Sequence, residues 1–364
     1  MTLIIFIAIL LILVLSHEAG HFFTAKFFGI KVEEFGFGIP PRIAGIKKGE
    51  TLYSLNLLPF GGFVKIFGED SPRSSESGAG GQNKGDNRSF GSKNAWQKSA
   101  VLLSGVVANI FLAFVIFAFV SFLGMPRGLS QEEASFYPDA RIAIVDVVLG
   151  SPAYSAGIQP GDKIKSIAGN IPKSMEEAQE IIRKNKGRNI LMELQRNGDM
   201  VGLNVTPRVE SPDGEGPLGI ALSWVRIEKS SWYKAPLEGV KITYNTFLGT
   251  VVGFSSAVKN LFAGQTQNIQ VSGPVGIFNI TKDVSRSGFN MLLMLVGILS
   301  VNLAIINVIP FPGLDGGRFL FVILESIRRK PISAKFGAVF HSIGLAILLA
   351  LMIAITLRDV SRIF

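Results

Sequence analysis

Four long apolar segments dominate the hydrophobic pattern of the chain. They lie within residues 1–28, 98–124, 289–317 and 336–358. A bilayer core needs about 20 mostly apolar residues in a helix, so the pattern predicts a polytopic α-helical membrane protein with about four transmembrane helices. The first segment has no Lys or Arg before its apolar run, and that run leads into Ser-His-Glu. It therefore lacks the features of a cleaved signal peptide, and we expect it to be a transmembrane helix.

The connection between the first two apolar segments has two parts. Residues 29–68 mix glycine and proline with β-forming residues, which predicts short strands and hairpins. Residues 69–97 are rich in glycine, serine and asparagine and nearly free of aliphatic side chains. Such a segment cannot bury enough apolar surface to offset the entropy of ordering it, so we expect a flexible loop.

A small α+β domain is predicted between the second and third apolar segments, over residues 140–208. It contains strand patterns around a helix pattern at 174–184, which starts with a Ser-x-x-Glu capping box. Residues 209–288 follow as a separate region. Within it, residues 236–262 are moderately apolar but carry several charged residues, so we interpret them as an amphipathic helix at the membrane interface.

The charge distribution predicts an orientation in the membrane. Lys and Arg are frequent in the first connection, residues 29–97, and in the predicted loop at 318–335. Short basic loops stay in the cytoplasm, so we expect both connections there and the α+β domain on the extracytoplasmic side. The chain would then be a multi-pass protein of the inner (cytoplasmic) membrane.

The amino-acid composition limits which environments, partners and catalytic groups the chain can have. Charged residues make up 17% of the chain and hydrophobic residues 48%, whereas soluble domains carry about 25% charged residues. The net charge is +9, but the basic residues are not clustered with aromatics, so we expect membrane lipid and no nucleic acid as a partner. The chain has no cysteine, which excludes disulfides, cysteine zinc ligands and a thiol nucleophile.

Residues His17-Glu18-Ala19-Gly20-His21 in the first apolar segment form an HExxH motif. Positions i and i+4 share one face of a helix, so His17 and His21 can bind one Zn²⁺ while Glu18 acts as general base. Ionisable residues inside a membrane span are costly unless they face the protein interior and have a role. The motif therefore predicts a catalytic zinc site.

A catalytic zinc site needs a third protein ligand, and the candidates are Asp315 and His341. Asp315 follows a segment broken by two prolines and a glycine, and irregular backbone at membrane depth is tolerated only beside protein or a water-filled cavity. We therefore expect Asp315 to be the ligand and His341 to lie at a helix end. If residues 236–262 do not span, the ends of the first and third spans meet on the same membrane face.

Three motifs together resemble the site-2 protease family, and most of all its bacterial regulator-of-sigma-E (RseP-like) proteases. They are HEAGH, residues 307–317 (NVIPFPGLDGG), and residues 151–164 (SPAYSAGIQPGDKI), which resemble the signature of protease-type PDZ domains. The resemblance covers nearly the whole chain, with room for one PDZ domain where the best-known members have two. The signature residues, which we assign to the PDZ groove region, are Ser151, Ala156, Gly157, Ile158, Gly161 and Asp162.

The resemblance implies an intramembrane zinc endopeptidase that cuts single-span membrane proteins, with or without a first cut by a site-1 protease. It implies that Glu33–Ile46 is a membrane-reentrant β-hairpin and that Asn307, and with it Pro310, contacts the substrate. An extended substrate could add as a strand to the hairpin edge, where Gly36, Gly38, Gly61 and Gly62 would leave room for it. Turn formation is the alternative role of these glycines.

Two other functions fit parts of the pattern. A membrane scaffold could bind metal structurally and ligands through its PDZ domain, but it would not need a base beside the metal ligands. A metal transporter would need further ionisable residues deep in the second and fourth spans, where the sequence has only Asn109 and His341. The sequence identifies neither the substrate nor the oligomeric state.

Overall fold

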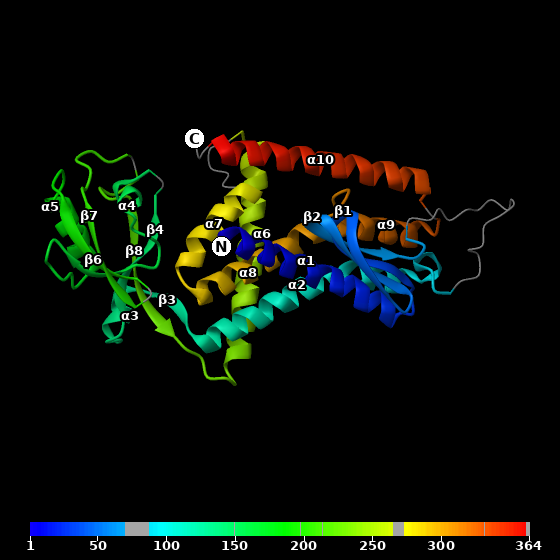
Figure 1. Ribbon diagram of the computed structural model, residues 1–364, viewed down its shortest axis with the longest axis horizontal. Helices are drawn as coiled ribbons and strands as arrows, with labels where there is room; N and C mark the ends of the chain where they lie inside the picture. The colour runs from blue at the N-terminus through cyan, green and yellow to red at the C-terminus, as the bar shows by residue number, and fades with distance from the viewer. Residues whose placement is uncertain are drawn as a thin grey trace. The chain divides into compact units, whose positions relative to one another are not determined.

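The computed structural model describes residues 1–69, 87–148, 150–196, 198–212, 214–264, 273–330 and 332–361 (Figure 1). The chain forms two compact units. Unit 1 comprises Met1–Ala118, Pro236–Thr281 and Met294–Phe364, and unit 2 comprises Phe119–Ala235 and Lys282–Leu293. Most of the predicted flexible loop at 69–97 lies outside the described residues. Its last part forms a short 3₁₀ helix, Phe90–Ser92, and the start of the next helix.

The elements that lie wholly or mainly in unit 1 are a hairpin and seven helices. They are α1 (Thr2–Phe27), β1 (Val32–Lys48), β2 (Thr51–Ile66), α2 (Ala95–Leu123), α6 (Ala235–Phe262), α7 (Pro274–Arg286), α8 (Phe289–Val308), α9 (Asp315–Arg328) and α10 (Ala334–Ser361).

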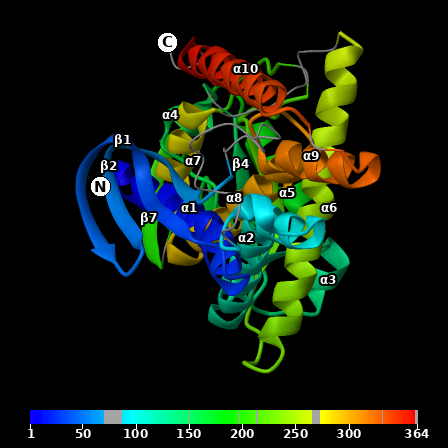
Figure 2. The same cartoon turned by 90° about the vertical axis from the view of Figure 1, so that its right-hand side faces the viewer.

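Four of the described helices are long and apolar enough to cross a membrane: α1, α2, α8 and residues Val339–Ser361 of α10. They agree with the four predicted segments, so the prediction of a polytopic helical membrane protein is confirmed at this level. Helix α6 is as long as these helices but is not among the candidate spans in the described chain. Figures 1 and 2 show α6 crossing the direction of α1 and α2 instead of running along them.

The prediction of a loop over residues 318–335 is wrong for most of that segment, because α9 occupies Asp315–Arg328. Phe319 and Val322 pack on a buried cluster of unit 1, while Arg318 and Arg328 are exposed. The helix is therefore amphipathic, and its charged side suggested a solvated connection. The apolar side of α9 packs on residues that are distant in the sequence, from α1, α2 and the hairpin. The sequence pattern alone does not reveal these contacts.

Strands β1 and β2 pair antiparallel in one sheet and form a hairpin within the region 29–68. The stretch Glu33–Ile46, predicted to be a hairpin by itself, belongs to the single strand β1. Residues 34–37 of β1 are paired twice, with residues 52–55 and with residues 62–65 of β2. They therefore lie inside the sheet, and residues 62–65 lie at its edge. Figure 1 shows the hairpin against the C-terminal half of α1. Its position relative to a membrane stays a prediction.

One buried cluster holds the hairpin to the helices. It contains Ala25, Ile30, Val32, Ile66, Phe90, Val101 and Leu102, with Phe22, Phe28, Val64, Phe319 and Val322 packed against it. These residues come from the end of α1, both strands, the start of α2 and α9. Burial of this apolar surface is what brings segments far apart in the sequence to one place.

Salt bridges tie the turn between β1 and β2 to the rest of unit 1. Glu50, in the turn between β1 and β2, pairs with Lys26 at the end of α1 and with Arg88. Hydrogen bonds, first from Lys26 and then from Arg88, hold the pKa of the Glu50 carboxyl below its ordinary value. The turn is thus anchored on the helix that carries the HExxH motif.

Unit 2 is built around a six-stranded sheet with the order β3-β8-β4-β5-β6-β7. Its elements are β3 (Met125–Leu129), α3 (Gln131–Ser135), β4 (Arg141–Val147), α4 (Pro152–Ser155), β5 (Lys163–Ile167), α5 (Met175–Lys184), β6 (Ile190–Arg196), β7 (Asp199–Val205) and β8 (Ile220–Glu228). Its core includes fully or nearly fully buried Ile144, Ile167, Met192 and Leu194.

The predicted α+β domain is larger than residues 140–208. Strand β8 lies between β3 and β4, so residues 125–129 and 220–228 belong to the same sheet. The boundary was wrong because β8 pairs with a strand about 80 residues earlier in the chain, and local patterns do not reveal such pairing. The predicted helix is confirmed: Ser174 caps α5 by accepting a hydrogen bond from the Glu177 amide.

The residues at 151–162 stabilise turns of unit 2. Ser151 caps α4 by accepting a hydrogen bond from the Tyr154 amide, and Gly157 and Gly161 adopt φ values of +79° and +95° that favour glycine. Asp162 is almost fully buried, forms a salt bridge to Arg196 at 2.7 Å and accepts a hydrogen bond from the Gln159 amide. The identity of unit 2 as a PDZ domain stays a prediction.

We expect Asp162→Ala to destabilise unit 2 by roughly 2–3 kcal/mol. Loss of the carboxylate leaves Arg196 without its partner, and the value lies below that for fully buried pairs because Arg196 is partly exposed. Hydrogen exchange of the β5 and β6 amides, measured in the full chain by mass spectrometry, should accelerate. The matched control is Asp139→Ala, which removes an exposed partner of Arg226 and should change exchange little. Equal exchange in both variants would contradict a stabilising role for Asp162.

Candidate metal centre

The two histidines of the HExxH motif lie on the inward face of α1. The buried residues of this helix are Phe6, Ile9, Leu13, His17, His21 and Ala25, which recur every three or four positions as one face of a helix does. His17 and His21 are 8% and 7% exposed. Helical periodicity alone therefore directs both imidazoles into the protein.

Asp315 reaches the histidines because the chain turns sharply after α8. Gly313 has φ +91°, which favours glycine. A Cβ on Gly316 would lie 2.3 Å from the carbonyl oxygens of Val308 and Ile309, and one on Gly317 would lie 2.3 Å from that of Phe311. The glycines thus allow α9 to start directly against the preceding turn, with Asp315 as its first residue.

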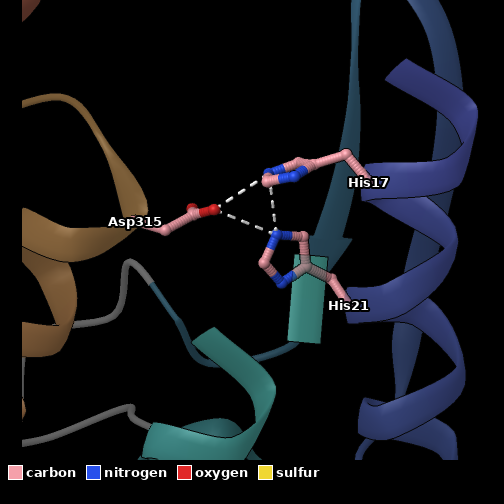
Figure 3. A group of neighbouring side chains, drawn as sticks. All are labelled: His17, His21 and Asp315. Carbon is pink, nitrogen blue, oxygen red and sulfur yellow. Dashed lines mark hydrogen bonds and ion pairs between the residues drawn. The ribbon is translucent and has the colours of Figure 1, made fainter. Parts of the chain in front are cut away.

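The three side chains converge on one point (Figure 3). His17 Nε2 and His21 Nε2 lie 2.9 and 3.2 Å from Asp315 Oδ2, and the two Nε2 atoms lie 3.2 Å apart. Ligand atoms about 2.0–2.1 Å from a tetrahedral Zn²⁺ are about 3.3 Å apart. Two imidazole nitrogens and a carboxylate oxygen at this spacing fit three protein ligands of a catalytic zinc ion.

A backbone contact fixes the tautomer of His21. Its Nδ1 lies 2.7 Å from the carbonyl oxygen of Val101 on α2. A carbonyl only accepts hydrogen bonds, so Nδ1 carries the proton and donates it. In the neutral imidazole this leaves the lone pair on Nε2, the atom that faces Asp315, and makes it available to a metal ion.

Glycines allow α1 and α2 to approach each other at the site. A Cβ on Gly20 of α1 would lie 2.3 Å from the carbonyl oxygen of Ser104. A Cβ on Gly105 of α2 would lie 2.5 Å from His21 Nε2 and 2.7 Å from His17 Cε1. Neither glycine was identified from the sequence, because the requirement for it arises from the packing of two helices.

His341 is not a member of the His17, His21 and Asp315 group. Its Nδ1 accepts a hydrogen bond of 3.1 Å from the Gly313 amide, and its ring packs edge-on against Phe321 and Phe340. The histidine therefore supports the turn that delivers Asp315. The choice of Asp315 over His341 agrees with this geometry.

A cavity of about 330 Å³ opens beside the three ligand atoms. It is lined by Glu18, His21, Gly62, Phe63, Val64, Lys65, Ile66, Glu69, Val101, Leu102, Gly313, Asp315 and Arg318. Glu18 lies on the cavity side of α1, and the edge of the hairpin forms the facing wall. An ion pair between Arg318 and Glu69 joins α9 to the end of the hairpin at this cavity.

The predicted substrate-binding residues do not line this cavity. Asn307 and Pro310 lie at the end of α8 and in the turn that follows it. Gly36 lies inside the sheet, where a Cβ would be 2.4 Å from the Phe63 ring, and Gly38 has φ +81°. Their contact with a substrate stays a prediction. The hairpin residues beside the site are those of 62–66, of which the sequence singled out only Gly62.

A second cavity, of about 300 Å³, lies in unit 2 between α5 and β8. It is lined by Gln179, Ile182, Arg183, Gly216, Pro217, Leu218, Ile220 and Leu222. None of the six predicted groove residues at 151–162 is among them. Residues 220–223 of β8 pair with β4, whereas β3 pairs only with residues 224–228.

Comparison with known proteins agrees with the geometry. The model of the family described as peptidase family M50 matches residues 5–351. The chain is 33% identical to a Clostridium perfringens protein over 96% of this chain and 95% of that protein. It is 30% identical to the zinc metalloprotease RasP of Oceanobacillus iheyensis and 29% identical to the regulator of sigma-W protease RasP of Bacillus subtilis. Each alignment covers 100% of this chain and 99% of the relative.

We expect Gly105→Ala to abolish or strongly weaken zinc binding, because the new methyl group would displace both imidazoles. Zinc content of the purified protein, measured by atomic absorption, should fall well below one ion per chain. Gly253→Ala in α6 is the matched control, since a Cβ there meets no atom within 4 Å. A Gly105→Ala protein with a full zinc content would show that the α1–α2 contact does not position the ligands.

Proposed function

Because the chain belongs to peptidase family M50, we propose that it is an intramembrane zinc endopeptidase. It hydrolyses peptide bonds within or beside the transmembrane segments of membrane proteins. The observation that carries the proposal is the convergence of His17, His21 and Asp315 on one point beside a cavity lined by Glu18. In this proposal the three residues hold Zn²⁺ and Glu18 is the catalytic base.

The residues divide the chemistry between them. When bound, Zn²⁺ polarises the scissile carbonyl and lowers the pKa of its water to about 7. The Glu18 carboxylate accepts a proton from the attacking water and later donates it to the leaving amine nitrogen. The backbone bond from His21 Nδ1 to Val101 keeps the imidazole oriented throughout. The buried position of the histidines limits access of bulk water to the reaction.

The hairpin edge at residues 62–65 supports a route for the substrate. A helical substrate hides its carbonyls in hydrogen bonds, so it must unwind before it is cut. An unwound segment can add as a further strand to the edge of β2, where residues 62–65 pair only with β1 in the described part of the chain, and can form backbone hydrogen bonds there. Gly62 belongs to β2, and a Cβ there would lie 3.2 Å from Glu18 Cγ. In this proposal the glycine lets β2, and the substrate strand paired with it, lie close to the catalytic base.

We further propose that unit 2 is a PDZ-like domain whose ligand groove lies between α5 and β8. The cavity there supports this position, as does the edge of β8 at residues 220–223, which pairs with β4 but not with β3 among the described residues. Membrane-bound regulators of sigma factors are a candidate substrate class, because one relative is named as a regulator of sigma-W protease. Substrates left by a first cut outside the membrane are candidates for binding in this groove.

A metal-binding scaffold without protease activity is not favoured. A structural zinc site closes its fourth position, whereas a cavity adjoins this donor set and a carboxylate lines it. For the orientation, we propose that unit 2 is extracytoplasmic and that the metal centre lies toward the cytoplasmic side. The course of α6 across α1 and α2 supports its location at the membrane interface.

We expect Glu18→Gln to retain zinc but to lower the rate of cleavage of a model single-span substrate by at least about 100-fold, because the base is lost while the ligands remain. His17→Ala should lose both zinc and activity. The measurements are gel-based cleavage and zinc content of the same purified preparations. Wild-type cleavage rates in Glu18→Gln would refute the assignment of the base.

The absence of native cysteine permits a direct test of orientation with single-cysteine variants. Exposed Lys173 of unit 2 and Lys330 after α9 are suitable positions. In intact spheroplasts a membrane-impermeant maleimide should label Lys173→Cys and not Lys330→Cys. In inverted membrane vesicles the pattern should reverse. Labelling of Lys330→Cys from outside would contradict the proposed topology.

A further inference from the structure

Helix α2 presents three consecutive turns of one face to the imidazoles. Val101, Gly105 and Asn109 are spaced by four residues and therefore lie above one another on the helix. Val101 accepts the hydrogen bond from His21 Nδ1, and Gly105 provides room for both rings. Val101 contacts Nδ1 of His21, and Asn109 makes the corresponding contact with His17. Asn109 Nδ2 lies 3.5 Å from His17 Nδ1.

Asn109 is fixed in this place and is fully buried, with 0% of its surface exposed. Its backbone carbonyl accepts a hydrogen bond of 2.8 Å from Ser300 Oγ on α8, and the neighbouring Ala108 carbonyl accepts one of 3.3 Å from Ser16 Oγ on α1. Its side-chain Oδ1, however, has no hydrogen-bond partner among the described residues. A buried acceptor without a donor is costly and needs an explanation.

The two protonation tautomers of His17 supply that explanation. Without a metal ion, His17 Nε2–H can donate to Asp315 Oδ2 at 2.9 Å, and Nδ1 accepts from Asn109 Nδ2. When Nε2 is a metal ligand, it has no proton, so Nδ1 carries the proton and needs an acceptor. A half-turn of the Asn109 amide places Oδ1 where Nδ2 lies and provides this acceptor.

We infer that Asn109 is the positioning residue of His17 and that its Oδ1 accepts the Nδ1 proton when the ion is bound. The inference rests on the proposed metal centre. An asparagine suits the position because one side chain offers both a donor and an acceptor, and so it satisfies His17 with and without the ion. Helix α2 thus orients both imidazoles, His21 through a backbone carbonyl and His17 through a side-chain amide.

The test is the zinc affinity of the purified full chain, measured by competition with a fluorescent chelator. Asn109→Leu has a similar size but no acceptor and should bind zinc about 10–100-fold more weakly, as loss of such a partner does elsewhere. Asn109→Asp restores an acceptor and should bind zinc within a few-fold of the wild type or more tightly. The matched control is Asn302→Leu, which removes the acceptor of a Thr250 hydrogen bond between α6 and α8, and it should keep wild-type affinity.

Thermal unfolding of the metal-free proteins separates positioning from folding, because Asn109→Leu should unfold at a temperature similar to the wild type. If that variant does not fold, Asn109→Ala replaces it and should show the same loss of zinc affinity. Wild-type affinity in the variants without an acceptor, or equal weakening in Asn109→Asp, would overturn the inference and leave the metal centre intact. A wild-type protein that binds no zinc would overturn the metal centre itself.

Discussion

The close contact between α1 and α2 is the constraint on which the site depends. Gly20 and Gly105 leave no space for a Cβ between the two helices. This proximity brings the Val101 carbonyl within 2.7 Å of His21 and Asn109 within 3.5 Å of His17. In lipid the hydrophobic effect does not drive helices together, so small residues that permit such close packing decide the geometry. The polar groups of the site can be satisfied only because the backbones are this near.

The remaining walls of the site follow from this contact. Helix α9 and the hairpin pack on the cluster formed by the ends of α1 and α2, and so they bring Asp315 and the β2 edge to opposite sides of one cavity. His341 and Gly313 hold the turn before Asp315, and the Glu50 ion pairs hold the hairpin to α1. The proposed metal ligands, the proposed base Glu18 and a strand edge thereby adjoin one cavity, as hydrolysis of an unwound peptide would require.

The proposed catalytic and substrate-binding functions belong to different units. Unit 1 contains most of the candidate spans' residues and all three candidate metal ligands. Unit 2 contains strand β8, which pairs with β3 over only residues 224–228 in the described part of the chain, and an adjoining cavity, features suited to binding an extended segment. If the proposed roles hold, substitutions at Glu18 would alter cleavage and substitutions in the α5–β8 cavity would alter substrate binding.

Features that depend on local periodicity could be predicted from the sequence. The lengths of the apolar segments predicted four spans, and the i, i+4 spacing placed His17 and His21 on one face. Proline and glycine beside a carboxylate pointed to Asp315. The helical state of α9, the place of β8 in the sheet of unit 2, and the proximity of residues 63–66 and Asn109 to the site became known from the three-dimensional arrangement. Each of these depends on contacts between residues distant in the chain, for which periodicity carries no signal.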